Sequence, residues 1–111
     1  MKVVQTFRRN NDFRRLYARG KSFVHPLLVL YVMKNNRGLK RIGITVSTKV
    51  GNAVVRNRCK RILREAFRLL EPEIPAGWDF VLVARTKTAA STMPAVKNVL
   101  SAQLKKAGVI G

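Results

Sequence analysis

The sequence has few acidic residues and few of the side chains that carry metal or redox chemistry. Of its 111 residues, 5 are Asp or Glu, 1 is His and 1 is Cys. Cys59 has no partner for an internal disulfide, and Cys59 and His25 together cannot supply the usual ligand set of a zinc site. No stretch approaches the roughly 18 consecutive apolar residues of a membrane span, and the N-terminus lacks the apolar segment of a secretory signal. We therefore expect a cytoplasmic chain with no membrane partner and no metal site of its own.

Basic residues dominate the charge of the chain. Its 23 Lys and Arg residues give a formal net charge of +18 and a pI near 11.7, which favours a polyanion as the usual partner, nucleic acid first. Apolar residues make up 47% of the sequence, enough for one folded core at this length. Residues 1–70 hold 18 of the basic and 2 of the acidic side chains, so the binding surface belongs mainly to this part. We predict a flexible basic arm over residues 1–9 and a single domain over residues 10–111.

The spacing of apolar residues predicts the main helices and strands. Phe13, Leu16 and Tyr17 are spaced as in a short helix that begins near residue 10 and ends near Gly20. An almost continuous apolar run predicts a central strand, followed by turn residues and an alternating return strand, which together indicate a hairpin. The return strand leaves small or polar side chains on one face, and that face could meet a ligand. The predicted strands span residues 27–33, 41–47 and 80–84, and a C-terminal helix begins near residues 91–94.

The segment from Val50 to Leu70 predicts a strongly amphipathic helix that starts after Gly51 and Asn52. At about 100° per residue, one face of this helix is basic and the opposite side is apolar. Like charges four residues apart destabilise a helix, and a face that is only solvated usually mixes charges of both signs. Because Glu65 alone interrupts the basic face, we interpret this face as an anion-binding ridge. Its cations are Arg56, Lys60, Arg61, Arg64 and Arg68.

A family resemblance is carried by the segment from Lys49 to Glu65, which reads KVGNAVVRNRCKRILRE. It resembles the signature of the bacterial ribonuclease P protein subunit, centred on Arg-Asn-Arg and the basic residues after it. The resemblance extends to the order of elements from about Phe7 to Lys106. It implies a single α/β domain, an α+β two-layer sandwich with a mixed sheet and the order helix, strand, strand, strand, helix, strand, helix. It also implies a left-handed crossover from the strand before Gly51 through the basic helix, where the usual rule predicts the opposite hand.

The family resemblance also implies a function. Proteins similar to this one assist a large catalytic RNA that removes the 5′ leader from precursor tRNA. The chain is then an accessory subunit of an endoribonuclease, with one protein per RNA and the active site in the RNA. Magnesium is expected to serve the RNA, because the sequence offers no carboxylate cluster. The sequence contains no evident catalytic group: we predict that His25 is structural, that Cys59 is a small buried apolar residue and that Asp79 is a turn residue.

Two RNA-binding surfaces follow from the resemblance. Arg suits the first because its planar guanidinium can bind phosphate through two hydrogen bonds, and aromatic rings suit the second because bases stack on them with little regard to sequence. Core packing is the alternative for Phe13 and Tyr17, and Tyr31 could equally cap the edge of the core. The residues assigned to the catalytic RNA are Arg56, Asn57, Arg58, Lys60, Arg61, Arg64, Arg68 and Lys49. Those assigned to the single-stranded leader of precursor tRNA are Phe13, Tyr17, Tyr31, Arg14 and Arg41.

Two other functions are compatible with the size and charge. A structural RNA-binding protein, such as a ribosomal protein, shares the composition, but it has no reason to combine an Arg-Asn-Arg motif with an aromatic cleft. A duplex DNA-binding module could place the helix from Arg56 to Arg68 in a major groove. Against that function, many cations lie outside this helix and no dimerisation seam is visible.

Overall fold

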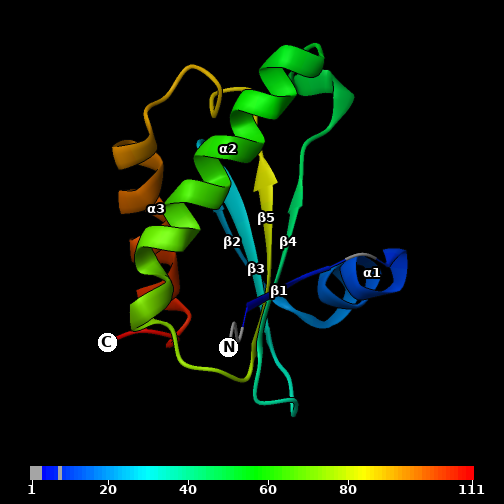
Figure 1. The fold of residues 1–111 in the computed structure, drawn as a ribbon, viewed down its shortest axis with the longest axis vertical. Coiled ribbons are helices and arrows are strands. Elements are labelled where there is room, and N and C mark those ends of the chain that lie inside the picture. The colour runs from blue at the N-terminus through cyan, green and yellow to red at the C-terminus, as the bar shows by residue number, and fades with distance from the viewer. Residues whose placement is uncertain (1–3, 8) are drawn as a thin grey trace.

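Short apolar segments form the strands of one mixed sheet. The structure is a computed structural model that describes residues 4–7 and 9–111, and within these residues the sheet has five strands. They are β1 (Val4–Thr6), β2 (Lys21–His25), β3 (Leu28–Lys34), β4 (Lys40–Thr45) and β5 (Trp78–Ala84). Their order across the sheet is β1-β4-β5-β3-β2 (Figure 1). Strands β1, β4 and β5 are parallel to one another, and β3 is antiparallel to β5 and β2.

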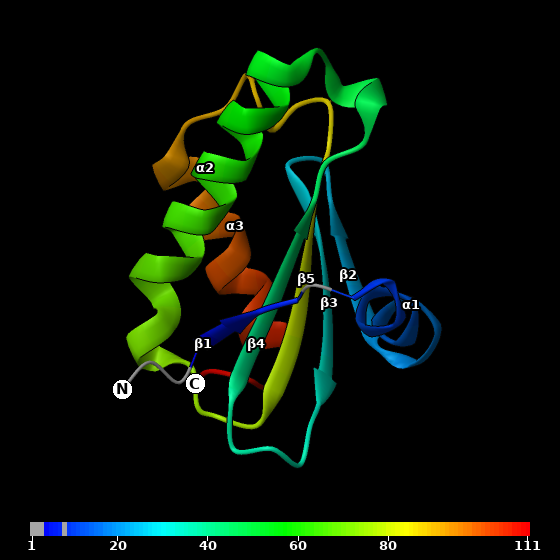
Figure 2. The same ribbon diagram turned by 45° about the vertical axis from the view of Figure 1, so that its right-hand side comes forward.

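Helices cover both faces of this sheet (Figure 2). Helices α2 (Ala53–Leu70) and α3 (Met93–Lys106) pack against each other on one face, and α1 (Asn10–Arg19) lies on the other. Short 3-10 turns flank α2 at Thr48–Val50 and Glu71–Glu73. The Asn52 side chain accepts a hydrogen bond from the Val55 N–H at 3.0 Å and so caps the start of α2. None of the described helices has both the length and the apolar character needed to cross a membrane.

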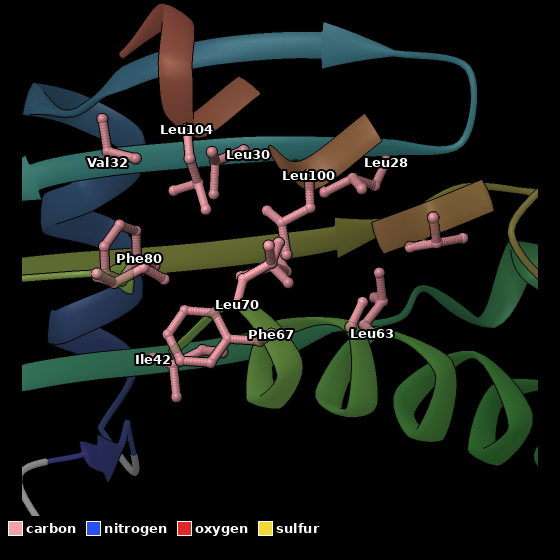
Figure 3. Close-up of a cluster of buried hydrophobic side chains, with 14 of the residues drawn as sticks. Leu28, Leu30, Val32, Ile42, Leu63, Phe67, Leu70, Phe80, Leu100 and Leu104 are labelled. Atoms are coloured by element: carbon pink, nitrogen blue, oxygen red, sulfur yellow. The ribbon is translucent and has the colours of Figure 1, made fainter. Parts of the chain in front are cut away.

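The main core lies between the sheet and the pair α2 and α3 (Figure 3). Alternate residues of β3 and β5 point to this side, among them the fully buried Leu30 and Phe80. Phe67 of α2 meets Phe80 with ring centroids 5.6 Å apart, and Leu63 and Leu100 belong to the same core further along the sheet. Burying a side chain of this size stabilises the fold by about 1.5–3 kcal/mol. The apolar side of α2 is therefore committed to the core, and its basic side is left for solvent.

The predicted α/β fold class is confirmed. The order of elements from α1 onward is the predicted one, and β2 is the additional strand that the resemblance implied before the basic helix. Strands β4 and β5 are neighbours and parallel, so the connection through α2 is a true crossover. It is left-handed: in Figure 1, α2 lies in front of the sheet, both strands run upward, and β5 is to the left of β4. Helix α1 adds a partial third layer to the two that were predicted.

The structure corrects the prediction of a flexible arm over residues 1–9. Strand β1 pairs in parallel with residues 40–42 of β4. The Phe7 N–H donates to the Ile42 carbonyl at 2.7 Å, and Phe7 is only 6% exposed. This strand could not be predicted, because three residues are too few to show an alternating pattern. Residues 1–3 and 8 lie outside the described part of the chain.

The predicted hairpin of β3 and β4 is wrong, because β5 lies between these strands. Hydrogen bonds join the segment before β5 to both ends of the connecting loop. The Asn35 N–H donates to the Gly77 carbonyl and the Gly77 N–H donates to the Leu39 carbonyl, both at 2.8 Å. Strand β5 suits the central place because its two faces are apolar and buried, with Phe80 on one and Val81 on the other.

Candidate nucleic-acid interface

Helix α2 presents a basic surface on the side opposite its apolar stripe. Its buried residues are Cys59, Leu63, Ala66, Phe67 and Leu70. Lys60, Arg61 and Arg64 are exposed, and within the described residues they form no ion pair. We call these three residues the basic ridge. Asn57 and Lys49 are exposed near the start of the helix. Unpaired cations on one rigid face are the arrangement that attracts a phosphate backbone.

Of the three other arginines predicted for this surface, two are bound to other groups of the protein and the third is half-buried. Arg68 Nε donates to Glu65 Oε2 at 3.0 Å, and this hydrogen bond lowers the pKa of Glu65 and raises the pKa of Arg68. Arg58 Nε donates to the Ala89 carbonyl at 3.0 Å, which ties α2 to the loop before α3. Arg56 is half-buried, and its buried Nε has no hydrogen-bond partner in the described chain. These arginines therefore have less charge or freedom to offer than the basic ridge.

A pair of aromatic rings marks a second surface, where α1 crosses the other face of the sheet. The rings of Tyr17 on α1 and Tyr31 on β3 meet edge to face with centroids 4.9 Å apart. Tyr17 is 43% exposed and Tyr31 is half-buried. We call these residues the tyrosine pair. Phe13 lies deeper, with its ring centroid 5.4 Å from that of Phe7 in a small core around Leu16 and Val81. Phe13 is half-buried and packs on this small core, as Tyr31 does, and Tyr17 is the most exposed of the three rings.

The sheet beside the tyrosine pair is open to solvent. Direct cross-strand partners place Val24, Val29, Val83 and Thr45 in one row on the face of the sheet that carries Tyr31. Val24 is 69% exposed and the other three are half-buried. This row, which we call the open row, includes the small and polar face of β4 on which the sequence predicted ligand contact. Arg14 is exposed on the neighbouring α1.

A buried carboxylate fixes α1 on the sheet. Asp79, at the start of β5, is fully buried and accepts a hydrogen bond from Asn35 Nδ2 at 2.6 Å. Its other oxygen lies 3.2 Å from Arg15 and 3.4 Å from Arg41. Arg41 also pairs with Asp12 of α1 at 2.8 Å. Asp12, Arg41, Asp79 and Arg15 thus form a continuous chain of ion pairs between helix and sheet, which we call the Asp79 network.

The Asp79 network corrects two predictions. The Arg41 side chain is only 9% exposed and neutralises Asp12 and Asp79, so it does not face a leader as predicted. Asp79 is not a simple turn residue but the centre of the network. The sequence held one signal for this role, because a carboxylate beside an apolar run needs cationic partners if it is buried. No pattern in the sequence predicted that Asn35 and Arg15 would contact Asp79, because these contacts depend on the tertiary fold.

The remaining polar candidates have structural roles, as predicted. His25 Nδ1 accepts a hydrogen bond from the Leu27 N–H at 3.0 Å in the turn between β2 and β3. Cys59 is fully buried, and burial raises the pKa of its thiol, an effect that the charge of Arg58 partly offsets. Among the described residues, no three His, Cys, Asp or Glu side chains gather where they could hold a metal ion.

Comparisons with known proteins agree with the resemblance seen in the sequence. A family model described as Ribonuclease P matches residues 1–108. The chain belongs to the ribonuclease P protein family. Among curated members of this family, the ribonuclease P protein component of Clostridium novyi is 46% identical over 111 residues, which cover 98% of both chains. That of Alkaliphilus oremlandii is 36% identical over 110 residues, covering 99% of this chain and 96% of the relative.

Solved structures of ribonuclease P proteins share the fold. The RNase P protein of Staphylococcus aureus matches with a TM-score of 0.81 and 37% identity, covering 96% of this chain and 97% of the other. The protein from Thermotoga maritima matches with a TM-score of 0.80 and 33% identity, covering 91% and 96%. Membership of the ribonuclease P protein family links this chain to tRNA processing and to an endoribonuclease.

Proposed function

We propose that the chain is the accessory protein subunit of ribonuclease P, and that it binds two RNA segments on opposite faces of one sheet. The catalytic RNA contacts the α2 side, and the single-stranded 5′ leader of precursor tRNA contacts the α1 side. The observation that carries this assignment is that α2, which holds the basic ridge, and α1, which holds Tyr17, lie on opposite faces of the sheet (Figure 2). A protein with two such surfaces can hold a substrate leader next to the RNA that cleaves it.

The basic ridge suits a folded RNA. Lys60, Arg61 and Arg64 are exposed on one rigid helix, and within the described residues no acid neutralises them. Arg binds phosphate bidentately, and each neutralised phosphate releases condensed counterions. Asn57 can add hydrogen bonds to sugar or backbone groups, and Lys49 extends the positive surface beyond the start of α2. Such contacts give affinity for RNA without a need for a particular sequence.

The tyrosine pair and the open row suit a single strand. A base that stacks on an aromatic ring gains about 1–3 kcal/mol, whatever its identity. Tyr17 offers the exposed ring, and the apolar surface of Val24, Val29 and Val83 continues beside it. The exposed Arg14 can meet the backbone of the same strand. This surface has the sequence tolerance that a subunit serving many precursor tRNAs needs.

The chemistry of cleavage belongs to the RNA in this proposal. Magnesium supports the phosphodiester hydrolysis carried out by the holoenzyme. The carboxylates nearest the leader surface, Asp12 and Asp79, are both paired with Arg41, so this chain's residues do not fit a magnesium site there. The protein's part is to bind, to orient the leader and to lower the repulsion between RNA strands. It does so in the cytoplasm, as one protein per RNA.

Cleavage of a precursor tRNA by the cognate catalytic RNA at low magnesium tests the proposal. We expect the protein to stimulate cleavage of the 5′ leader and to be inert without the RNA. The same assay on the variant Lys60→Gln/Arg61→Gln/Arg64→Gln should show weaker stimulation at low protein concentration, restored at high concentration. If well-folded protein binds the RNA but gives no stimulation, the chain is a structural RNA-binding protein instead.

A further inference from the structure

We propose that Asp79 is a positioning residue that shapes the leader-binding surface around the tyrosine pair by holding α1 on the sheet. The inference rests on the proposed function and extends it to a residue that is fully buried. It follows from three observations: the two ion-pair contacts that the Asp79 network makes with α1, the link through α1 from that network to the tyrosine pair, and the balance of charge inside the network.

The network joins α1 to the sheet at two points one helical turn apart. Asp12 and Arg15 are three residues apart in α1, so both can face the sheet. Arg41 lies between the two acids, at 2.8 Å from Asp12 and 3.4 Å from Asp79, and Arg15 reaches Asp79 at 3.2 Å. Leu16 and Phe13 already pack α1 on the sheet through apolar contacts. The two ion-pair contacts, at different heights along the helix, add a restraint on its rotation about its axis.

The rotation of α1 determines where Tyr17 lies. Tyr17 is two residues beyond Arg15 on the same helix, and its ring is 4.9 Å from that of Tyr31. An edge-to-face contact at this distance is weakened when either ring moves outward by about an ångström. Because Tyr31 belongs to a central strand, the movable partner is Tyr17. The Asp79 network therefore controls the shape of the aromatic surface without contributing a side chain to it.

The charge balance makes Asp79 the critical member. Two acids and two arginines neutralise one another in the network, and the Arg41 side chain is only 9% exposed. Without the Asp79 charge, Arg15 and Arg41 repel each other and a single acid remains to hold Arg41. A buried charge that loses its partner is strongly unfavourable. The helix can relieve this repulsion by swinging Arg15 outward, which moves Tyr17 with it.

The test compares two nearly isosteric substitutions, Asp79→Asn and Glu71→Gln, in the assembled holoenzyme. Glu71 serves as the control because it pairs with Lys40 at 2.8 Å, and the Lys40 side chain, like that of Arg41, is 9% exposed; the Glu71 side chain itself is 27% exposed, against 0% for Asp79. Glu71 follows α2, and its pair lies at the other face of the sheet. Each substitution raises the net charge by one. For Asp79→Asn we expect the preference for precursor over mature tRNA to fall about tenfold, within the range of one lost stacking contact. Affinity for the catalytic RNA should stay unchanged, and Glu71→Gln should keep the full preference.

Several outcomes overturn the inference. If both variants lose the preference equally, the loss reflects general destabilisation. If Asp79→Asn binds precursor tRNA more tightly than the wild type, only the added positive charge matters. If Asp79→Asn fails to fold, as judged by the fluorescence of the single Trp78, Arg15→Gln tests the same link, since its side chain is 37% exposed. An unchanged preference in folded Arg15→Gln then refutes the inference. A wild-type holoenzyme without any preference for precursor tRNA contradicts the proposed function instead.

Discussion

Replacing Lys60, Arg61 and Arg64 together with glutamine should flatten the salt dependence of binding to the catalytic RNA. Each phosphate contact contributes about 0.7 to 0.9 to the slope of log K against log salt. All three side chains are exposed and unpaired within the described residues, so the variant should lose about 2 to 3 from that slope. Between about 0.1 and 0.4 M salt, wild-type affinity should then fall about 15- to 60-fold more than that of the variant. Anisotropy titrations of labelled RNA across this range measure both slopes.

The matched control carries the same loss of charge on a different helix. Lys97, Lys105 and Lys106 belong to α3, outside the predicted RNA-binding surface, and their replacement by glutamine should leave the slope nearly unchanged. Arg68→Gln should also have a smaller effect than a single ridge substitution, because Glu65 already neutralises Arg68. Equal flattening by both triple variants would show that the RNA senses only net charge. An unchanged slope in the ridge variant would refute the assignment of the ridge.

The other predictions concern single residues. Tyr17→Ala should weaken binding of precursor tRNA by about 1–3 kcal/mol and leave mature tRNA unaffected, whereas Tyr17→Phe keeps the ring and the affinity; equal losses for both tRNAs would return Tyr17 to a packing role. Gly43→Ala should lower stability by about 1–3 kcal/mol in thermal melts, because a Cβ there would lie 2.5 Å from the Phe13 ring, and an unchanged melting temperature would contradict this packing. Because burial raises the pKa of Cys59, thiol reagents should label the native protein slowly and the urea-unfolded protein fast. Rapid native labelling would mean that α2 is rotated from its described position.

The sequence predicted best those elements whose evidence is local. The helix predicted between residues 50 and 70 is Ala53–Leu70, because its cap, Asn52, and its apolar period are contained in the segment itself. The helix predicted from residue 10 to Gly20 is Asn10–Arg19, and here the apolar spacing alone was the signal, because no side chain caps its start. The burial of Cys59 followed from its phase on α2. In each case the feature could be predicted from residues close together in the sequence.

The arrangement of the strands could not be predicted, and the Asp79 network was missed with it. Arg41 and Asp79 are direct cross-strand partners in the pairing of β4 with β5. The predicted hairpin of β3 and β4 placed a different strand beside Arg41, so nothing brought it to Asp79. An arginine in an alternating strand of a basic protein then suggests a surface contact with RNA. Tertiary pairing decided its role, and that pairing depends on residues far apart in the sequence.

The few acids of this chain hold elements together, and this use leaves the basic ridge under repulsion. Asp12 and Asp79 anchor α1, and Glu71 ties the end of α2 to Lys40 of β4. The ridge retains Lys60 and Arg64 four residues apart, a spacing that destabilises a helix by about 0.2–0.5 kcal/mol per pair. The ridge variant should therefore be slightly more stable than the wild type at low salt, even though it binds RNA less well. The gain should vanish in about 1 M salt, where such repulsion is screened. A lower free energy of unfolding at low salt would show that these side chains stabilise the fold. A higher one would show that the basic ridge lowers the stability of the free protein, as expected for a surface whose role is to bind RNA.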